Sequence, residues 1–279
     1  MKRILTNSMI AEFDTFLRLD EKSINTIEKY LRDLRAFCVF ADAREITKNI
    51  VMEYKTSLVV NYEVTSANSM LAAVNAFLRF KGWRDCCVKQ FKVQKKTFCS
   101  EDKELTKEEY VRLVNTAKKT GNERLSLILQ TICATGIRVS ELQFVTVEAV
   151  RKGVAVVTCK NKTRTIFFVR ELQKKLLSYL RNKGITSGCV FVTKSGKPIS
   201  RCNVWREMKA LCKQARVSSD KVFPHNLRHL FARIFYAIEK DVVKLADILG
   251  HSSINTTRIY IITTGAEHKR KMENMRLII

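Results

Sequence analysis

The sequence predicts a mainly α-helical protein with a small antiparallel β-sheet, divided into two domains. Apolar residues recur at the i, i+3, i+4 spacing of amphipathic helices through residues 1–88 and again through most of the chain from residue 105. Two short runs of β-branched and aromatic residues flank a Lys-Asn-Lys turn at residues 160–162, which is the pattern of a β-hairpin. The length of 279 residues is sufficient for two domains with separate cores.

The strongly basic composition favours a polyanionic partner. The chain has 51 Lys and Arg against 27 Asp and Glu, and its net charge of +24 causes self-repulsion unless a polyanion binds. Nucleic acid is the leading candidate. An anionic membrane surface is the alternative, but the sequence has no long apolar run and no signal-peptide core at its start, so no membrane association is expected.

The nine cysteines are expected to be structural residues. Cys38, Cys133 and Cys212 occupy apolar positions of helical patterns, and no C-x-x-C pair occurs, so neither a zinc site nor a redox motif is predicted. Unpaired cysteines in a chain without an export signal fit a reducing cytoplasm, where we expect the protein to be located.

Four helices are predicted in residues 1–88, and together they suit a four-helix bundle. Their apolar positions are Ile10, Phe13, Phe16 and Leu17; Ile27, Tyr30, Leu31, Leu34, Phe37 and Cys38; Ile50, Val51, Tyr54 and Leu58; and Met70, Leu71, Val74, Phe77 and Leu78. Thr47 suits the cap of the third helix, and Gly82 can end the fourth in a left-handed turn. Basic residues between the apolar positions, such as Arg32, Arg35 and Lys55, form either a solvated face or a nucleic-acid-binding face.

Residues 89–104 are predicted to link the two domains and to lie against DNA phosphates, because they are dense in lysine and lack helical periodicity. The second domain, residues 105–279, begins at a capping box formed by Thr106 and Glu109. The helix that this capping box starts is expected to run to Gly121, and the next helix is expected to stop at Thr135-Gly136.

The middle of the second domain carries the strand signals. The hairpin strands are predicted at Val154–Cys159 and Thr163–Val169, and a further strand is predicted at Val190–Thr193. A helix is expected between the hairpin and the further strand. Helices are expected from there to the end of the chain.

Three of the four histidines lie in residues 223–262, which suggests a reaction centre. Pro224 suits the first turn of a helix, and His225, Arg228 and His229 then follow at i, i+3 and i+4 on neighbouring turns of one face. An apolar stripe is expected to anchor this helix through Leu227, Leu230, Phe231, Ile234 and Ile238. These polar groups would therefore be fixed at the N-terminal end of a packed helix.

Two further site residues follow this helix. Gly250 can end the next helix and leave His251 in a turn. Ser252 or Ser253 can cap the last helix, which carries Tyr260. Residues 223–262 thus combine three histidines, Arg228 and Tyr260 as candidate site residues.

Four short motifs resemble the signature of the tyrosine recombinase (phage integrase) family. They are H-N-L-R-H at 225–229, L-G-H at 249–251, a tyrosine nine positions after that histidine, and A-T-G-I-R-V-S-E-L at 134–142, which contains Arg138 and Glu141. The resemblance covers essentially the whole chain. It implies a helical core-binding domain in the N-terminal part and a mixed α/β catalytic domain from Thr106 onward.

The resemblance implies a role for each matching residue. Tyr260 is the implied nucleophile, which attacks a scissile DNA phosphate and leaves a 3′-phosphotyrosyl intermediate and a free 5′-hydroxyl. A phenol is a weak nucleophile at neutral pH, so it needs assistance. Arg138 and Arg228 are implied to grip the non-bridging oxygens. His225 is implied to give acid–base assistance to the tyrosine, and His251 a further hydrogen bond to the phosphate.

A hairpin lysine, His229 and Glu141 complete the predicted site. The family assigns protonation of the leaving 5′-oxygen to a hairpin lysine; Lys160 is our choice, and Lys162 is the alternative because the turn is a residue shorter than the family pattern. His229 either orients its neighbours or touches the phosphate. Glu141 is expected to hold another site residue in place. No nucleotide cofactor is expected, because the phosphotyrosine preserves the energy of the broken phosphodiester. No metal ion is expected, because residues 223–262 lack the clustered carboxylates that a two-metal nuclease needs.

The predicted function is that of a site-specific DNA recombinase associated with a bacterial nucleoid. Its expected partners are double-stranded DNA recombination sites, on two of which it would assemble as a tetramer, alone or paired with a related recombinase. Integration or excision of a mobile element is favoured over Xer-type resolution of chromosome or plasmid dimers. A type IB topoisomerase and a catalytically silent DNA-binding regulator are less favoured functions. The apolar tail, residues 277–279, is hypothesised to dock on a neighbouring subunit.

Overall fold

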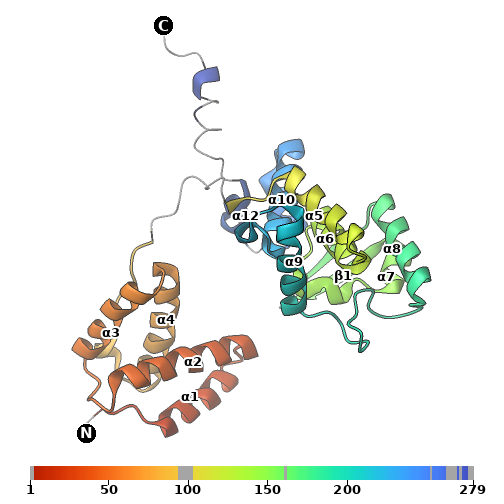
Figure 1. Ribbon diagram of the computed structural model, residues 1–279. Coiled ribbons are helices and arrows are strands. Elements are labelled where there is room, and N and C mark those ends of the chain that lie inside the picture. The colour runs from red at the N-terminus through yellow and green to blue at the C-terminus, as the bar shows by residue number, and fades with distance from the viewer. Residues whose placement is uncertain are drawn as a thin grey trace. The chain divides into compact units, whose positions relative to one another are not determined.

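The computed structural model describes residues 3–93, 103–159, 162–251, 253–261, 269 and 272–275. The chain divides into two compact units, Met1–Lys95 and Lys96–Ile279, each with a buried core of its own (Figure 1). The mainly helical fold class predicted from the sequence is confirmed. The proposed limits of the linker, residues 89–104, stay a prediction, and the tail at 277–279 lies outside the described residues.

Unit 1 consists of four helices and a short 3-10 turn. The elements are α1 (Asn7–Leu19), α2 (Ile24–Ala41), α3 (Lys48–Asn61), α4 (Val64–Phe80) and η1 (Arg84–Cys86). Thr47 caps α3 as predicted, because its side chain accepts a hydrogen bond from the backbone N–H of Ile50. Gly82 follows α4 with a φ of +75°, which is the predicted left-handed turn.

Aromatic rings fill the centre of unit 1. Phe13, Phe37 and Phe77 are fully buried there. Phe16 was expected on the same apolar face of α1 as Phe13, but it is 40% exposed. Its ring contacts Phe80 at a centroid distance of 4.8 Å, so Phe16 lies at the edge of the core.

Substitution of Phe77 by alanine is expected to lower the free energy of unfolding of unit 1 by about 3–5 kcal/mol. The change removes a ring that makes edge-to-face contacts with Phe13 at 5.5 Å and with Trp83 at 6.0 Å, and it leaves a cavity. Urea denaturation followed by circular dichroism measures the loss. Phe16→Ala is the matched control and should lose less than half as much; equal losses would contradict the placement of Phe77 at the centre.

Unit 2 is built around helix α6. Its elements are α5 (Lys107–Lys119), α6 (Glu123–Thr135), η3 (Val139–Phe144), α7 (Val147–Lys152), β1 (Val154–Cys159), β2 (Lys162–Phe167), α8 (Arg170–Lys183), α9 (Arg201–Ala215), η4 (Ser219–Lys221), α10 (Pro224–Glu239), α11 (Val242–Leu249) and α12 (Ile254–Ile261). Helix α6 contacts α5, α8, α9 and α10 and therefore lies at the centre of unit 2 (Figure 1). Thr106 and Glu109 form the predicted capping box at the start of α5.

The predicted hairpin is present, but the further strand is not. Strands β1 and β2 pair antiparallel from Val154 opposite Phe167 to Cys159 opposite Lys162. The prediction of a strand at 190–193 is wrong: within the described residues, this run makes one isolated bridge, between Val192 and Pro198. Val190 donates to the carbonyl of Val145, and Phe191 accepts from Ile199, so the run is buried as a loop against the core without a continuous partner strand.

Helix α10 is anchored by only part of the predicted apolar stripe. Leu227 and Leu230 are buried, whereas Ile234 and Ile238 are 39% and 76% exposed. The stripe therefore holds the N-terminal half of α10, which carries the candidate site residues. None of the helices in the described parts of the chain is long and apolar enough to span a lipid bilayer.

Candidate active site

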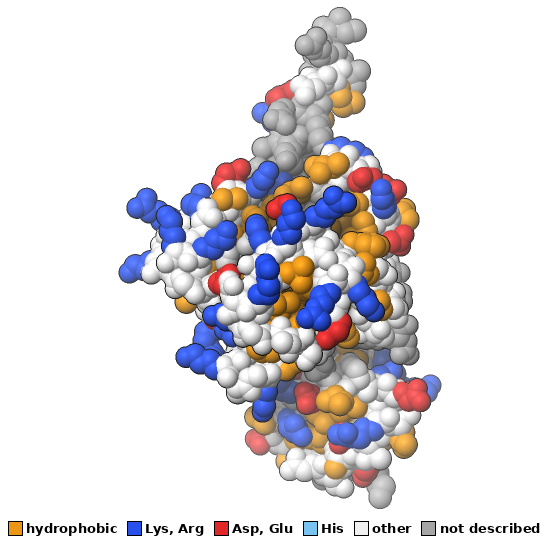
Figure 2. Space-filling model, turned by 90° about the vertical axis from the view of Figure 1, so that its right-hand side faces the viewer, with side chains coloured by type: hydrophobic (Ala, Val, Ile, Leu, Met, Phe, Trp, Pro, Cys, Tyr) orange, Lys and Arg blue, Asp and Glu red, His pale blue; other side chains and the backbone are white. Residues whose placement is uncertain are grey.

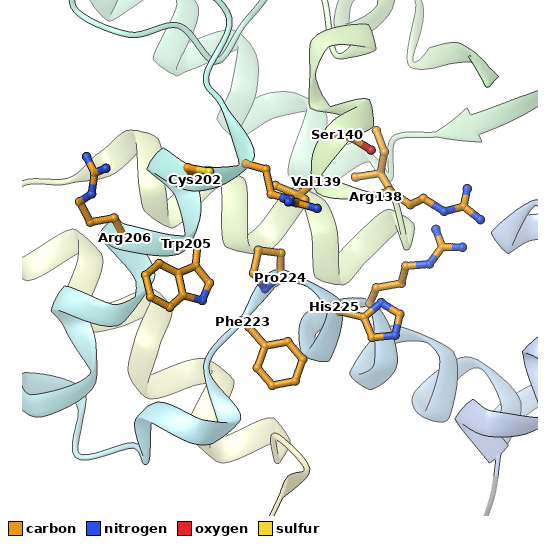
Figure 3. Close-up of a pocket in the computed structure, with 12 residues that line it drawn as sticks. Arg138, Val139, Ser140, Cys202, Trp205, Arg206, Phe223, Pro224 and His225 are labelled. Atoms are coloured by element: carbon orange, nitrogen blue, oxygen red, sulfur yellow. The ribbon is translucent and has the colours of Figure 1, made fainter. Parts of the chain in front are cut away.

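A pocket of about 650 Å³ opens beside the start of α10. Figure 3 shows Arg138 and His225 at one end of this pocket and Trp205 and Arg206 of α9 at the other. Arg228 also lines it. The pocket therefore brings together three of the residues that the motifs single out.

The beginning of α10 fixes the orientation of these side chains. Pro224 occupies the first helical turn, where its missing N–H leaves no intrahelical hydrogen bond unmade. Arg228 points inward and is 2% exposed, whereas His225, one turn earlier, is exposed and His229 is half-buried. One short helical segment thus presents a buried cation and two imidazoles to the same region.

Arg228 closes the ends of two helices. Its guanidinium donates to the carbonyl of Gly136, which ends α6, and to the carbonyl of Leu249 at 2.6 Å, which ends α11. Carbonyls at helix C-termini lack intrahelical partners and carry partial negative charge, so they suit a buried cation. Burial, together with the nearby Arg138, lowers the pKa of Arg228 to about 10, which leaves the group charged at neutral pH.

Gly136 permits this close packing. Its φ is +64°, and a Cβ atom there would lie 2.6 Å from Cδ1 of Phe231 on α10. Any larger residue would therefore be strained and would push α10 away from α6. The hydrogen bond from Arg228 to the carbonyl of Gly136 depends on this close packing of α10 against the end of α6.

A buried carboxylate joins Arg138 to a second arginine. Glu141 is 2% exposed, and its oxygens accept from Nη1 of Arg138 at 2.9 Å and from Nη2 of Arg164 at 2.7 Å. Burial acts to raise the pKa of Glu141, but hydrogen bonds from the backbone N–H of Arg138 and from both guanidiniums outweigh it, and the pKa is lowered. Glu141 is thus an ionised group that contacts Arg138, and its positioning role stays a prediction.

Sequence reasoning missed Arg164. A signal for it exists, because side chains alternate between faces along a strand and Arg164 stands two residues before the buried Ile166. A charge on the buried face of a strand requires a buried partner. Glu141 is that partner, and it ties the hairpin to the segment that carries Arg138.

His251 lies in the turn after α11, as predicted. Gly250 ends that helix with a φ of +63°. Nε2 of His251 lies 3.0 Å from Nη2 of Arg228, and Nδ1 lies 2.8 Å from the hydroxyl of Thr257. Since a guanidinium can only donate, Nε2 accepts and Nδ1 carries the proton toward Thr257. Burial, and then the nearby Arg228, lower the pKa of His251 to about 4, so the ring is neutral at pH 7.

Thr257 is a second residue that sequence reasoning missed. It is fully buried on α12, one helical turn before Tyr260, and it fixes the tautomer of His251. Its spacing from the tyrosine places both on one face, but a buried threonine has no distinctive sequence signal. Only the fold identifies its partner.

Tyr260 lies among three imidazole rings. It is 3% exposed, and its ring centroid lies 5.6 Å from His225, 5.0 Å from His229 and 5.4 Å from His251. Its hydroxyl is 3.5 Å from Nε2 of His225, at the limit of a hydrogen bond. The tyrosine side chain is therefore held in place by packing while its hydroxyl has a basic nitrogen nearby.

The two histidines of α10 are both favoured in the neutral form. Although part of the residue is exposed, desolvation of its ring beside Tyr260, and then the charges of Arg228, His229 and Arg138, lower the pKa of His225. Burial also lowers the pKa of His229, against a hydrogen bond to the carbonyl of Ile259. A neutral His225 can accept a proton at neutral pH.

The structure thus gathers most of the predicted site. The three histidines contact Tyr260, Arg228 contacts His251, and Glu141 contacts Arg138, which lines the same pocket as Arg228 and His225. Lys160 lies outside the described residues, and of Lys162 only the backbone pairing with Cys159 is described, so the choice between the two lysines stays a prediction. The described residues hold no group of three histidine, cysteine or carboxylate side chains arranged to bind a metal ion.

Family comparison identifies both parts of the chain. Residues 103–266 match the phage integrase family, and residues 10–85 match the phage integrase N-terminal SAM-like domain. Tyrosine recombinase XerA of Thermococcus kodakarensis is 30% identical, over 98% of this chain and 96% of its own. Tyrosine recombinase XerD of Halalkalibacterium halodurans is 30% identical, over 92% of this chain and 94% of its own.

Solved structures agree with these matches. The crystal structure of XerA recombinase is 25% identical, with a TM-score of 0.54 over 99% of this chain and all of its own. XerH recombinase in a post-cleavage complex with a palindromic difH substrate has a TM-score of 0.73 and 19% identity, over 98% of this chain and 84% of its own. The second similarity establishes the fold alone.

Proposed function

The chain belongs to the phage integrase family of tyrosine recombinases, and from this premise we propose that Tyr260 is the nucleophile with which it cleaves and rejoins DNA. The protein is a site-specific DNA recombinase. The observation that carries the assignment is the position of the Tyr260 hydroxyl, 3.5 Å from a neutral His225 and beside the guanidinium of Arg228. A phosphate diester bound by that guanidinium would lie in reach of the hydroxyl.

Arg138 and Arg228 are proposed to bind the non-bridging oxygens of the scissile phosphate. Both line the pocket at the start of α10, and guanidinium forks match pairs of phosphate oxygens. Negative charge builds on these oxygens as the phosphorus becomes five-coordinate, so fixed cations stabilise the transition state more than the ground state. His251 is proposed to add a hydrogen bond to the phosphate from the same side; for this its Nε2 must carry the proton and exchange the contact with Arg228 for one with a phosphate oxygen.

The reaction exchanges one ester bond for another. The Tyr260 oxygen forms a bond to phosphorus as the bond from phosphorus to the 5′-oxygen breaks, and the phenolic proton passes to His225. The leaving 5′-oxygen takes a proton, which we assign to the hairpin lysine at 160 or 162. Attack by another strand's 5′-hydroxyl then reverses the steps and releases the tyrosine, so the exchange needs no external energy source.

We propose double-stranded DNA recombination sites as the partner and a tetramer on two sites as the working assembly. Lys and Arg are more numerous than Asp and Glu on the face seen in Figure 2, in accord with the net charge of +24. Contacts of these residues with phosphates position the protein along the duplex and make binding sensitive to salt. The λ integrase tetramer bound to a Holliday junction has the same fold, with a TM-score of 0.75 over 93% of this chain.

A nicked suicide duplex tests the proposed chemistry. The nick lets the short fragment that carries the 5′-hydroxyl diffuse away after cleavage, so a covalent intermediate accumulates. Peptide mapping of the adduct should identify a 3′-phosphate linked to Tyr260. Linkage to another residue, or cleavage without a covalent product, would refute the nucleophile assignment.

The rate of adduct formation should have an acid limb with a midpoint below pH 6.5. His225 must be neutral to accept the phenolic proton, and burial with the nearby Arg228 lowers its pKa from the ordinary value of about 6.5. Below the midpoint, the rate should fall about tenfold per pH unit. Single-turnover rates from pH 5 to 8 measure the limb. His225→Gln should react slowly and lack it; a wild-type midpoint above 6.5 would contradict the assignment.

The choice of DNA site decides the biological role. Integration or excision of a mobile element and dimer resolution use the same strand exchange, so duplexes from element ends and from a chromosomal resolution site should be compared. A topoisomerase would instead relax a plasmid of arbitrary sequence. We expect adducts only at specific sites.

A further inference from the structure

One face of α10 holds the first described residues of unit 2. Nδ2 of Asn226 donates to the carbonyl of Lys103 at 2.8 Å, and Arg233 forms an ion pair with Glu104. Between them, Nδ1 of His229 lies 3.9 Å from Oε1 of Glu104. Positions 226, 229 and 233 follow the helical period, so all three side chains project from the same side of α10.

Glu104 is a buried charge whose position needs an explanation. It is 8% exposed, although acidic residues are rarely buried unless they are paired. Arg233 pairs with Oε2, but among the described residues no donor lies within hydrogen-bond distance of the buried Oε1. A carboxylate oxygen without a donor is unfavourable in a protein interior. The nitrogen that faces it is Nδ1 of His229.

His229 connects Glu104 to the tyrosine helix. Its Nε2 lies 3.4 Å from the carbonyl of Ile259, and its ring centroid lies 5.0 Å from that of Tyr260. Each ring nitrogen thus faces an acceptor, one on the segment at 103–104 and one on α12; the neutral ring donates to one of them at a time, and the protonated ring can donate to both. The imidazole bridges these two segments and contacts the ring of the proposed nucleophile.

We propose that Glu104 is a positioning residue for the cleavage reaction, which acts through His229 to hold α12 and the Tyr260 hydroxyl at the phosphate. This inference rests on the proposed function of Tyr260. Glu104 closely follows residues 94–102, the stretch of sequence that leads from unit 1 into the described part of unit 2. The placement of the nucleophile therefore depends on how the chain enters unit 2, as well as on the motif residues.

The test is Glu104→Gln, which keeps the size of the side chain and removes its charge. At saturating protein, the single-turnover rate of adduct formation on a nicked suicide duplex should fall about tenfold, because a small displacement of a nucleophile is costly. The dissociation constant for the uncleaved duplex, measured by gel shift, should stay within twofold. Glu108→Gln on the exposed side of α5 changes the charge equally and should leave both quantities unchanged.

A double-mutant cycle separates positioning from general stability. His229→Gln removes the same link from the other end and should slow adduct formation to a similar degree, and it serves as the test if Glu104→Gln fails to fold. The double variant should be no slower than the slower single variant. Multiplied effects, or a wild-type rate in Glu104→Gln, would overturn the proposal. If wild-type protein forms no adduct, or Tyr260→Phe retains it, the proposed function itself fails instead.

Discussion

Tyr260→Phe is expected to abolish the covalent protein–DNA adduct. The substitution removes only the hydroxyl oxygen, which is the atom that forms the bond to phosphorus in the proposed reaction. The ring is 3% exposed and is held by three imidazoles, and the hydroxyl's contact with His225 is long at 3.5 Å. Folding and DNA binding should therefore be retained. Denaturing gel electrophoresis after incubation with a nicked suicide duplex measures the adduct.

Tyr236→Phe is the matched control for this result. Tyr236 packs against the same small apolar cluster as Tyr260, so it shares that environment without a place in the proposed chemistry. The control should form adduct at the wild-type rate. An adduct that persists in Tyr260→Phe and disappears in Tyr236→Phe would reassign the nucleophile.

Arg138→Ala is expected to lower the single-turnover rate of adduct formation about 10²–10³-fold, the loss typical when one fixed donor to transition-state charge is removed. The side chain of Arg138 is 36% exposed, and Glu141 keeps Arg164 as a partner after the substitution, so the fold should survive. Site binding should weaken far less than the rate. Rates at saturating protein, together with melting temperatures, separate these effects.

Arg170→Ala is the control for charge. It removes one exposed cation at the start of α8, away from the pocket, and should leave the rate unchanged. Arg228 is a poorer choice for the first experiment, because its guanidinium also closes the ends of α6 and α11. A rate loss in Arg138→Ala no larger than in Arg170→Ala would contradict a role in phosphate binding.

Local signals in the sequence predicted local structure well. The caps at Thr47, Thr106 and Gly250 depend on residues within one helical turn, and each is found where predicted. The hairpin follows from β-branched runs on both sides of a turn. By contrast, the strand predicted at 190–193 required a partner strand, and no local pattern reveals whether one exists.

The candidate site was predictable to the extent that its residues stand in motifs. The motif spacing selected Arg138, His225, Arg228, His251 and Tyr260 without revealing their distances. Arg164, Thr257 and Glu104 were missed because each is defined by a buried partner that is remote in sequence or by a packing position. The exposure of Ile238 escaped prediction for a related reason: periodicity identifies a face of a helix but not how far the neighbouring elements cover it.

The two hydrogen bonds of Arg228 to helix ends affect which substitutions a duplicated copy of this gene would tolerate. A duplicate released from selection for strand cleavage could lose the hydroxyl of Tyr260 with little penalty, because its contact with His225 is at the limit of a hydrogen bond and Arg228 keeps its bonds to two backbone carbonyls. The same duplicate could not lose Arg228 without exposing unpaired carbonyls at the ends of two helices. In a duplicated gene, a retained Arg228 would therefore indicate that the fold is intact. A retained Tyr260 is needed to indicate that the enzyme is active.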